Sequence, residues 1–229
     1  MTDTAGTTDA AGVLFDVDGT LLDTNYLHVL AWWQAFRDTG HDEVTMASIH
    51  RAIGIASEGL VEHLVGRADD AAVEAHTRRY EALRDQVVAF PRTAELVEVC
   101  AKHGLTVVLA TSGKEADLEW MVPAVGAGKS IAGATTSSAV DQAKPAPDLL
   151  SAAMAEHGLS PKRTVVVGDT VWDVESARRA QLPCIALTCG GISRAELLEA
   201  GAAEVYDDPA DLLDRFAESL LGRVSGEGD

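Results

Sequence analysis

Two aspartates stand at the end of a short apolar run near the start of the chain. The run Val13-Leu14-Phe15 leads into Asp16 and Asp18, which precede Gly19-Thr20. An apolar run that stops at a glycine-containing turn is typical of a buried strand, and strand alternation places Asp16 and Asp18 on the same side at its carboxyl end. Two neighbouring carboxylates repel unless a cation or a shared proton serves them. The pair therefore indicates a metal ion, a proton-transfer reaction or both, although Asp and Gly are also common in plain turns.

Two later segments carry polar groups beside the predicted ends of a strand or the start of a helix. Thr111-Ser112 follows an apolar run, and hydroxyls beside the backbone N–H groups that open a helix can hold an anion, although the same residues are common helix caps. Lys144 stands in Ala-Lys-Pro-Ala-Pro-Asp, where Pro145 and Pro147 stiffen the loop before a helix. Most lysines are solvated surface charges. Lys144 is of interest because it stands in this stiff loop just before a helix.

A second pair of aspartates ends another apolar run. Asp169 leaves Val165-Val166-Val167-Gly168, and Asp173 follows one helical turn later on roughly the same side. Capping of a helix is the alternative role for Asp169. The strand–Gly–Asp context favours a metal ligand instead.

Together these four motifs, in this order and spacing, resemble those of the haloacid dehalogenase superfamily. The resemblance implies that Asp16 is the nucleophile and forms an acyl phosphate. It implies that Asp18 protonates the leaving oxygen and then activates water. Lys144 would neutralise both the nucleophile and the transferring phosphoryl group.

The same resemblance implies a Mg²⁺ cofactor and a phosphate seat. Asp16 and Asp169 would supply carboxylate oxygens to the metal, Asp18 its backbone carbonyl, and Asp173 a ligand or an acceptor beside the ligands. The phosphate would be bound by the side chain of Thr111 and the amide of Ser112. Thr20 is expected to fix the turn through a local hydrogen bond.

The elements that must position these residues alternate between helix and strand from Pro91 onward, which predicts a doubly wound parallel α/β sheet of the Rossmann-like type. Between the first strand and that region the periodicity is helical throughout. We therefore predict an α/β core over residues 1–23 and 90–229, with an all-helical cap domain over residues 24–89.

Three expectations about local structure follow from the same patterns. Asp69 to Val88 is predicted to form one long charged helix. Residues 1–11 are predicted to be a disordered lead-in, and Gly222 to Asp229 a frayed tail.

The cap residues bear on the type of reaction. An insertion in this place resembles the group that holds phosphoglycolate phosphatases and β-phosphoglucomutases, in which His28 and Trp32 fall where cap residues face the substrate. Helix packing is the alternative for both. Asp18 favours a phosphate-ester reaction over dehalogenation, and the segment around Gly54 lacks the cation that sugar mutases carry there.

We therefore expect a magnesium-dependent phosphatase acting on a small phosphorylated metabolite. The alternatives are a phosphomutase, in which Arg51 and Arg67 would compensate for the missing cation, and a noncatalytic relative that binds a metabolite.

Composition narrows the class of protein. The formal charge of −18 over 229 residues leaves no basic stripe for nucleic acid. No run approaches the roughly 20 apolar residues that span a membrane, and the first residues lack a signal-peptide pattern. Three cysteines without zinc-ligand spacing fit a reducing compartment, so we expect a cytoplasmic protein. The sequence leaves open whether it is a monomer or a homodimer.

Overall fold

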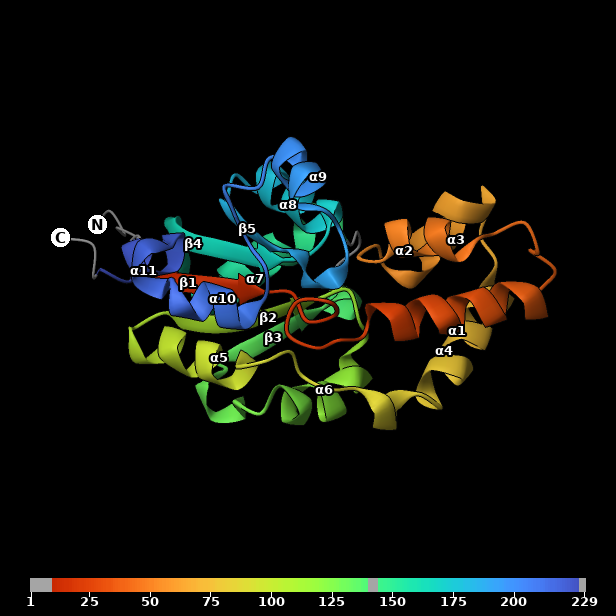
Figure 1. Cartoon of the computed structure of the whole chain (residues 1–229), viewed down its shortest axis with the longest axis horizontal. Coiled ribbons are helices and arrows are strands. Elements are labelled where there is room, and N and C mark those ends of the chain that lie inside the picture. Colours follow the sequence, from red (N-terminus) through yellow and green to blue (C-terminus); the bar gives the residue numbers. More distant parts are fainter. Residues whose placement is uncertain (1–9, 140–143, 227–229) are drawn as a thin grey trace, which may run out of the picture.

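A six-stranded parallel sheet forms the centre of the structure, which is a computed structural model describing residues 10–139 and 144–226 (Figure 1). Its strands lie in the order β3-β2-β1-β4-β5-β6, so the chain winds in both directions from β1. The strands are β1 (Ala10–Phe15), β2 (Thr106–Thr111), β3 (Gly133–Thr136), β4 (Leu159–Gly168), β5 (Cys184–Leu187) and β6 (Glu204–Tyr206). This is the doubly wound α/β fold that the sequence predicts.

Each face of the sheet has its own apolar core, because successive side chains of a strand point to opposite faces. Val13 and Phe15 of β1 join the core on one face, whereas Leu14 joins the core on the other. The helices of the first face are α5 (Thr93–Lys102), α6 (Leu118–Val125), α10 (Pro209–Asp214) and α11 (Leu220–Ser225). Those of the second face are α7 (Asp148–His157), α8 (Val171–Arg179) and α9 (Arg194–Ala200).

Four helices between β1 and α5 stand apart from the sheet, on the right of Figure 1. They are α1 (Asn25–Asp38), α2 (Met46–Ala52), α3 (Ser57–Val65) and α4 (Asp70–Glu81). They enclose a separate apolar core with Trp32, Phe36 and Leu60 among its buried members. We call α1–α4 the helical group.

The helical group is joined to the sheet by two chain segments that pair with each other. Leu22 on the outgoing segment forms an antiparallel bridge with Ala89 on the returning one. Asp23 N–H donates to the carbonyl of Val88, with 2.9 Å between nitrogen and oxygen. The two connections therefore leave and re-enter the sheet side by side.

This pairing corrects one predicted element. The predicted helix over Asp69 to Val88 ends at Glu81, and a short 3₁₀ turn over Arg84–Gln86 follows. Val87 and Val88 must run extended so that the returning segment can pair with the outgoing one, and that requirement overrides their local helical preference.

The expectations for the chain ends were also partly wrong. The predicted frayed tail contains part of α11, which is capped by Ser219 and buries Leu221 completely. Ala10 and Ala11 belong to β1 rather than to a lead-in. Residues 1–9 and 227–229 lie outside the described residues.

The sheet brings the chemical motifs together because neighbouring parallel strands end at one edge. β1 pairs with both β2 and β4. Asp16, Ser112 and Asp169 each follow one of these strands directly, so they meet at the carboxyl edge, where α/β sheets bind ligands.

Candidate active site

The side chain of Lys144 joins two carboxylates at this edge. Its Nζ donates a short hydrogen bond to Oδ1 of Asp16 and lies 2.7 Å from Oδ1 of Asp173. All three side chains are buried, with Lys144 only 2% exposed. A buried lysine needs such partners, because an unpaired charge in the interior is strongly unfavourable.

Asp169 lies beside this group and is completely buried. Its Oδ1 accepts from the Thr20 hydroxyl at 3.0 Å, and its Oδ2 accepts from the Asn25 amide at 2.8 Å. The Thr20 hydroxyl also makes the expected local hydrogen bond, to Oδ2 of Asp16 at 3.4 Å, so its bond to Asp169 is an additional long-range contact. The sheet topology brings Asp169 over the turn that carries Thr20, so the hydroxyl spans 149 positions of the sequence.

The local electrostatics show an excess of negative charge. Burial raises the pKa of Asp16 to about 7; Lys144 opposes this shift, and Asp173 and Asp18 add to it. Burial, followed by repulsion from Asp173 and Asp16, raises the pKa of Asp169 well above its ordinary value. Burial acts to lower the pKa of Lys144, but Asp16 and Asp173 outweigh it and keep the ammonium charged.

This cluster fits a hard divalent cation. Asp16, Asp169 and Asp173 each offer a carboxylate oxygen, and the three oxygens lie within 4.8 Å of one another. Few carboxylates, completed by water and a substrate phosphate, are the usual protein ligands of Mg²⁺. One lysine faces three buried carboxylates here, so a cation would relieve the remaining repulsion.

Asp18 points away from the carboxylate cluster, toward the helical group. Its Oδ1 accepts from the Thr24 hydroxyl at 2.7 Å and lies 3.3 Å from Nε2 of His28. Burial acts to raise the pKa of Asp18. The electrostatic attraction of His28 and the hydrogen bonds from His28 and Thr24 outweigh burial and hold the pKa below its ordinary value. Asp18 is therefore a carboxylate at neutral pH.

The two residues expected to bind phosphate lie at the end of β2. The Thr111 side chain is completely buried, and its hydroxyl accepts from the Gly113 N–H at 3.0 Å. The Ser112 hydroxyl donates to the carbonyl of Gly54, in the loop between α2 and α3, at 2.9 Å. Ser112 thus links the edge of the sheet to the helical group, and the phosphate contacts of both residues stay predictions.

A cavity of about 980 Å³ opens between the sheet edge and the helical group. Asp16, Asp18 and Lys144 line its floor, and Ser112 its side. Both candidate residues of α1 line it too, but they differ in exposure: the His28 side chain is 15% exposed, whereas Trp32 is 2% exposed and belongs to the core of the helical group.

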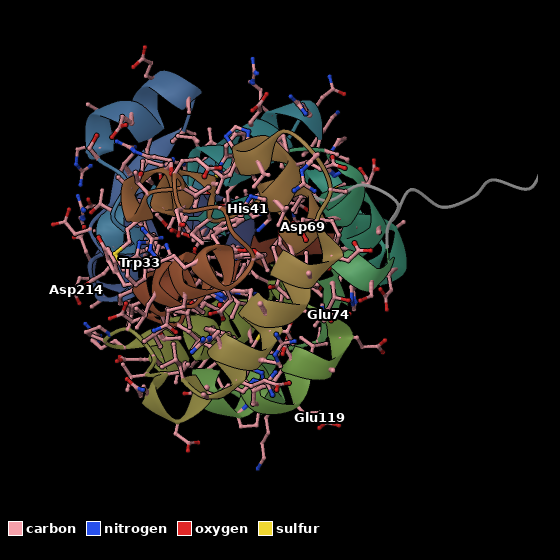
Figure 2. All side chains as sticks on the ribbon, turned by 90° about the vertical axis from the view of Figure 1, so that its right-hand side faces the viewer. Trp33, His41, Asp69, Glu74, Glu119 and Asp214 are labelled. Carbon is pink, nitrogen blue, oxygen red and sulfur yellow. The ribbon has the colours of Figure 1, made fainter. Side chains whose placement is uncertain are left out.

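The neighbouring Trp33 faces elsewhere. It is half-buried at the edge of the core of the helical group, and the Arg37 guanidinium stacks over its ring at 4.0 Å (Figure 2). The two adjacent tryptophans thus occupy different faces of α1, as helical geometry requires.

Several residues of the site escaped the sequence reasoning. Thr24 and Asn25 hold the key carboxylates, while His76 and Tyr80 of α4 line the cavity. Arg84 also lines it and binds Asp117 at 2.7 Å. Thr24 contacts Asp18 from only six positions away, whereas the others depend on contacts between distant segments, and no local pattern marks any of them.

The comparisons with known proteins agree with this geometry. The family model described as haloacid dehalogenase-like hydrolase matches residues 13–187. A crystal structure of a hydrolase from Pseudomonas syringae superimposes with a TM-score of 0.85 and 34% identity, covering 91% of this chain and 98% of that one.

Curated relatives give the same result. The probable phosphatase IndB of Dickeya dadantii is 30% identical over 91% of this chain and 94% of its own length. A phosphoglycolate phosphatase of Pseudomonas savastanoi pv. phaseolicola is 27% identical over 93% of this chain and 84% of its own. A 31% match to the chloroplastic protein Suppressor of Quenching 1 of Arabidopsis thaliana spans 20% of that longer protein.

Proposed function

The chain belongs to the haloacid dehalogenase-like hydrolases, and we propose that it is a magnesium-dependent phosphatase that hydrolyses a small phosphate monoester through a phosphoaspartyl intermediate on Asp16. One observation carries the proposal. The buried Asp16 contacts Lys144 and lies within the carboxylate cluster, while Asp18 stands two residues away on the floor of the same cavity. A nucleophile, a cation and an acid–base group thus meet at one place.

Asp16, Asp169 and Asp173 would hold Mg²⁺, joined by the backbone carbonyl of Asp18. When bound, the ion would withdraw charge from the phosphoryl oxygens and offset the repulsion among the carboxylates. This proposal rests on the chemistry of the three carboxylates and on the raised pKa values of Asp16 and Asp169.

The reaction would proceed in two displacements. A carboxylate oxygen of Asp16 attacks phosphorus, and the bond from phosphorus to the ester oxygen breaks. Asp18 is ionised in the free site, so it must first take up a proton, which repulsion from the incoming phosphate charge favours. It then gives this proton to the ester oxygen, so the alcohol leaves neutral. Asp18 then takes a proton from water, whose oxygen attacks phosphorus and releases inorganic phosphate from Asp16.

Lys144 would act on charge rather than on protons. Its ammonium already contacts Asp16, so it can stabilise the oxygens of the transferring phosphoryl group without moving far. Thr111 and the amide of Ser112 would hold the other phosphate oxygens at the end of β2.

We propose that residues 24–89 form a cap domain on a core made of residues 1–23 and 90–229. The separate apolar core of the helical group and the paired connections at Leu22 and Ala89 support this division. A cap in this position would exclude water from the cavity and select the leaving group.

The cavity suits a leaving group larger than the phosphate itself. Its volume lies at the upper end of ordinary ligand sites, roughly 300–1,000 Å³. Away from Asp16, Asp18 and Lys144, the described wall of the cavity carries charges of both signs, from Glu58, Glu62, Glu81 and Lys114. Arg84 also lines the wall, but it forms an ion pair with Asp117. We infer that the substrate is a small phosphorylated metabolite with His28 and Trp32 near its leaving group.

A phosphomutase is the alternative. Its second phosphate needs a cation in the helical group, and neither arginine considered for that role lines the described cavity. Arg51 binds Glu196 at 2.5 Å, and Arg67 lies 3.8 Å from Asp69. This arrangement supports the phosphatase over the mutase.

Among the described residues, none of the helices combines the length and apolar character of a membrane span. The free thiols of Cys100, Cys184 and Cys189 support our proposal of a cytoplasmic enzyme.

The test is inorganic phosphate release from a panel of small phosphate monoesters with Mg²⁺, beside the Asp16→Asn variant. Release by the wild type alone supports the phosphatase, and the ranking of substrates reports what the cavity selects. Interconversion of sugar phosphates without net release would favour the mutase. Binding without any turnover would favour the noncatalytic relative.

A further inference from the structure

Four aromatic rings form two stacked pairs between α1 and α4. The rings of His28 and Tyr80 lie 3.8 Å apart at 12°, and those of Trp32 and His76 lie 3.9 Å apart at 9°. Each helix contributes two residues four positions apart, which face the same side. The first residue of one helix pairs with the second of the other, so the two helices run antiparallel through this contact.

The two imidazoles also bond to each other, edge to edge. Nδ1 of His28 lies 3.2 Å from Nε2 of His76, and the ring planes differ by 24°. The other nitrogen of His28, Nε2, lies 3.3 Å from Oδ1 of Asp18. A continuous chain thus runs from Asp18 through His28 to His76.

His76 is the buried end of this chain. It is 7% exposed, and burial, followed by repulsion from His28 and Lys114, lowers its pKa well below its ordinary value. A neutral imidazole has one N–H and one lone pair, so His76 can complete an N–H···N bond whichever ring supplies the proton. Trp32 covers one of its faces, which keeps the ring in place.

The hydrogen-bonded series from Asp18 through His28 to His76 restricts how the Asp18 side chain can turn. Thr24 and His28 both contact Oδ1 of Asp18. Among the described residues no hydrogen bond involves Oδ2, which leaves that oxygen available to the substrate. If the His28 ring rotated about its χ2 angle, Nε2 would leave Oδ1, and the bond to His76 together with the Tyr80 stack opposes that rotation.

We propose that His76 is a positioning residue for the proton transfer at Asp18, acting by fixing the ring of His28. This inference rests on the proposed phosphatase reaction and adds to it a residue of the helical group that no sequence motif marks. The helical group would then contribute to the chemistry as well as to substrate choice.

The inference has a kinetic signature in the leaving group. An alkoxide is a strong base and leaves only with a proton, whereas p-nitrophenolate is a weak base and leaves without one. A misplaced Asp18 would therefore slow the release of an alcohol and spare the release of p-nitrophenolate. A loss of general stability would slow both.

The experiment compares three substitutions of His76. In His76→Gln the side-chain amide reaches the position of the imidazole Nε2, whereas in His76→Asn it ends near the position of Nδ1, too short to reach His28. Both lose the stack on Trp32. His76→Phe keeps a ring for the stack but has no polar atom.

The leaving group is followed in a single turnover, with Mg²⁺ and either p-nitrophenyl phosphate or the best alkyl phosphate of the panel. We expect His76→Asn and His76→Phe to slow alcohol release about tenfold or more, because they lose part of the acid catalysis. Both should change p-nitrophenolate release less than about twofold, because that leaving group needs no proton. His76→Gln should stay close to the wild type on both substrates. Asp18→Asn sets the size of the effect when the acid is missing.

His41→Phe is the matched control, because His41 is also a buried imidazole of the helical group. It is 6% exposed and binds Asp69 at 2.8 Å, on the outer side of the group in Figure 2. Its loss should lower the melting temperature without changing the ratio of the two release rates.

Four outcomes would overturn the inference. Equal slowing of both substrates would reduce His76 to a structural role. Unchanged alcohol release in His76→Asn would show that proton transfer at Asp18 does not depend on the hydrogen bond between His28 and His76. A His76→Gln variant as slow as His76→Asn would exclude the hydrogen bond as the cause. A wild type inactive on every phosphate would overturn the proposed phosphatase and this inference with it.

Discussion

The amide of Asn25, the first residue of α1, donates to Oδ2 of Asp169 across 2.8 Å and 144 positions of sequence. The same amide also donates to the carbonyl of Gly190 at 3.0 Å. Asn25 therefore fixes a proposed metal ligand from the point where the chain enters the helical group. Removing a group that orients a metal ligand in this way commonly lowers metal affinity or activity by about 10- to 100-fold.

We expect Asn25→Leu to weaken Mg²⁺ binding by roughly 10-fold or more, because Asp169 loses a donor that orients it. Calorimetric titration with Mg²⁺ in the absence of substrate measures this directly. Thr39→Val is a useful control, since that hydroxyl bonds only to carbonyls of its own helix. Unchanged Mg²⁺ affinity in Asn25→Leu would remove Asn25 from the metal site.

Without Mg²⁺ the protein should become less stable as the pH rises through about 7. Asp16 has its pKa raised from 3.8 to about 7 by burial, so the folded state keeps a proton that the unfolded state has lost. That contribution is fully present below pH 3.8 and is lost as the pH rises through the folded-state value.

Melting temperatures in chelator between pH 5 and pH 8 test this, with Asp16→Asn as the comparison. The wild type should fall more steeply with pH than the variant, whose amide does not titrate. Parallel slopes would show that Asp16 keeps an ordinary pKa. Added Mg²⁺ should restore stability at the higher pH, where Asp16 is a carboxylate.

Lys144→Met should lose turnover by a factor of about 100 or more, since it removes the cation beside the nucleophile. It also leaves Asp16 and Asp173 without their shared partner, so the melting temperature should fall, and Mg²⁺ should raise it more than in the wild type. Phosphate release and thermal unfolding with and without Mg²⁺ measure both effects. Near-normal turnover would contradict the role given to Lys144.

Gly54→Ala should impair turnover through the contact between the helical group and the core. Gly54 has a φ of +103°, and an added Cβ would lie 2.7 Å from Oγ1 of Thr170. The carbonyl of Gly54 accepts from Ser112, so displacement of this loop would also disturb the phosphate seat.

Gly66→Ala is the control for backbone strain. Its φ is +80°, and no atom lies within 4 Å of the added Cβ. Both variants should lose about 1 kcal/mol of stability from the backbone alone, but only Gly54→Ala should change kcat or KM. Equal kinetics in the two variants would show that the contact at Gly54 does not influence the site.

Much of the fold follows from local sequence signals. Val13-Leu14-Phe15 and the alternation of helix and strand after Pro91 predict a parallel sheet, and the structure contains it. The end of α4 at Glu81 could not be predicted, because pairing between Ala89 and Leu22 decides it. Such pairing depends on segments far apart in sequence.

The candidate site divides in the same way. Asp16, Lys144, Asp169 and Asp173 stand in patterned segments beside strand ends or before a helix, and the structure brings them together. His76 lies in an ordinary charged helix, and only the antiparallel packing of α1 and α4 reveals its contact with His28. Local patterns mark the residues at the strand ends, whereas tertiary packing supplies their partners.

The most direct test of the central claim is to trap the covalent intermediate. The wild-type enzyme would be mixed with Mg²⁺ and its best substrate, quenched in acid within one turnover, digested and mapped by mass spectrometry. The account predicts a phosphate adduct on the peptide containing Asp16, and none in Asp16→Asn. An adduct on another residue, or turnover by the wild type with no adduct at any time, would contradict it.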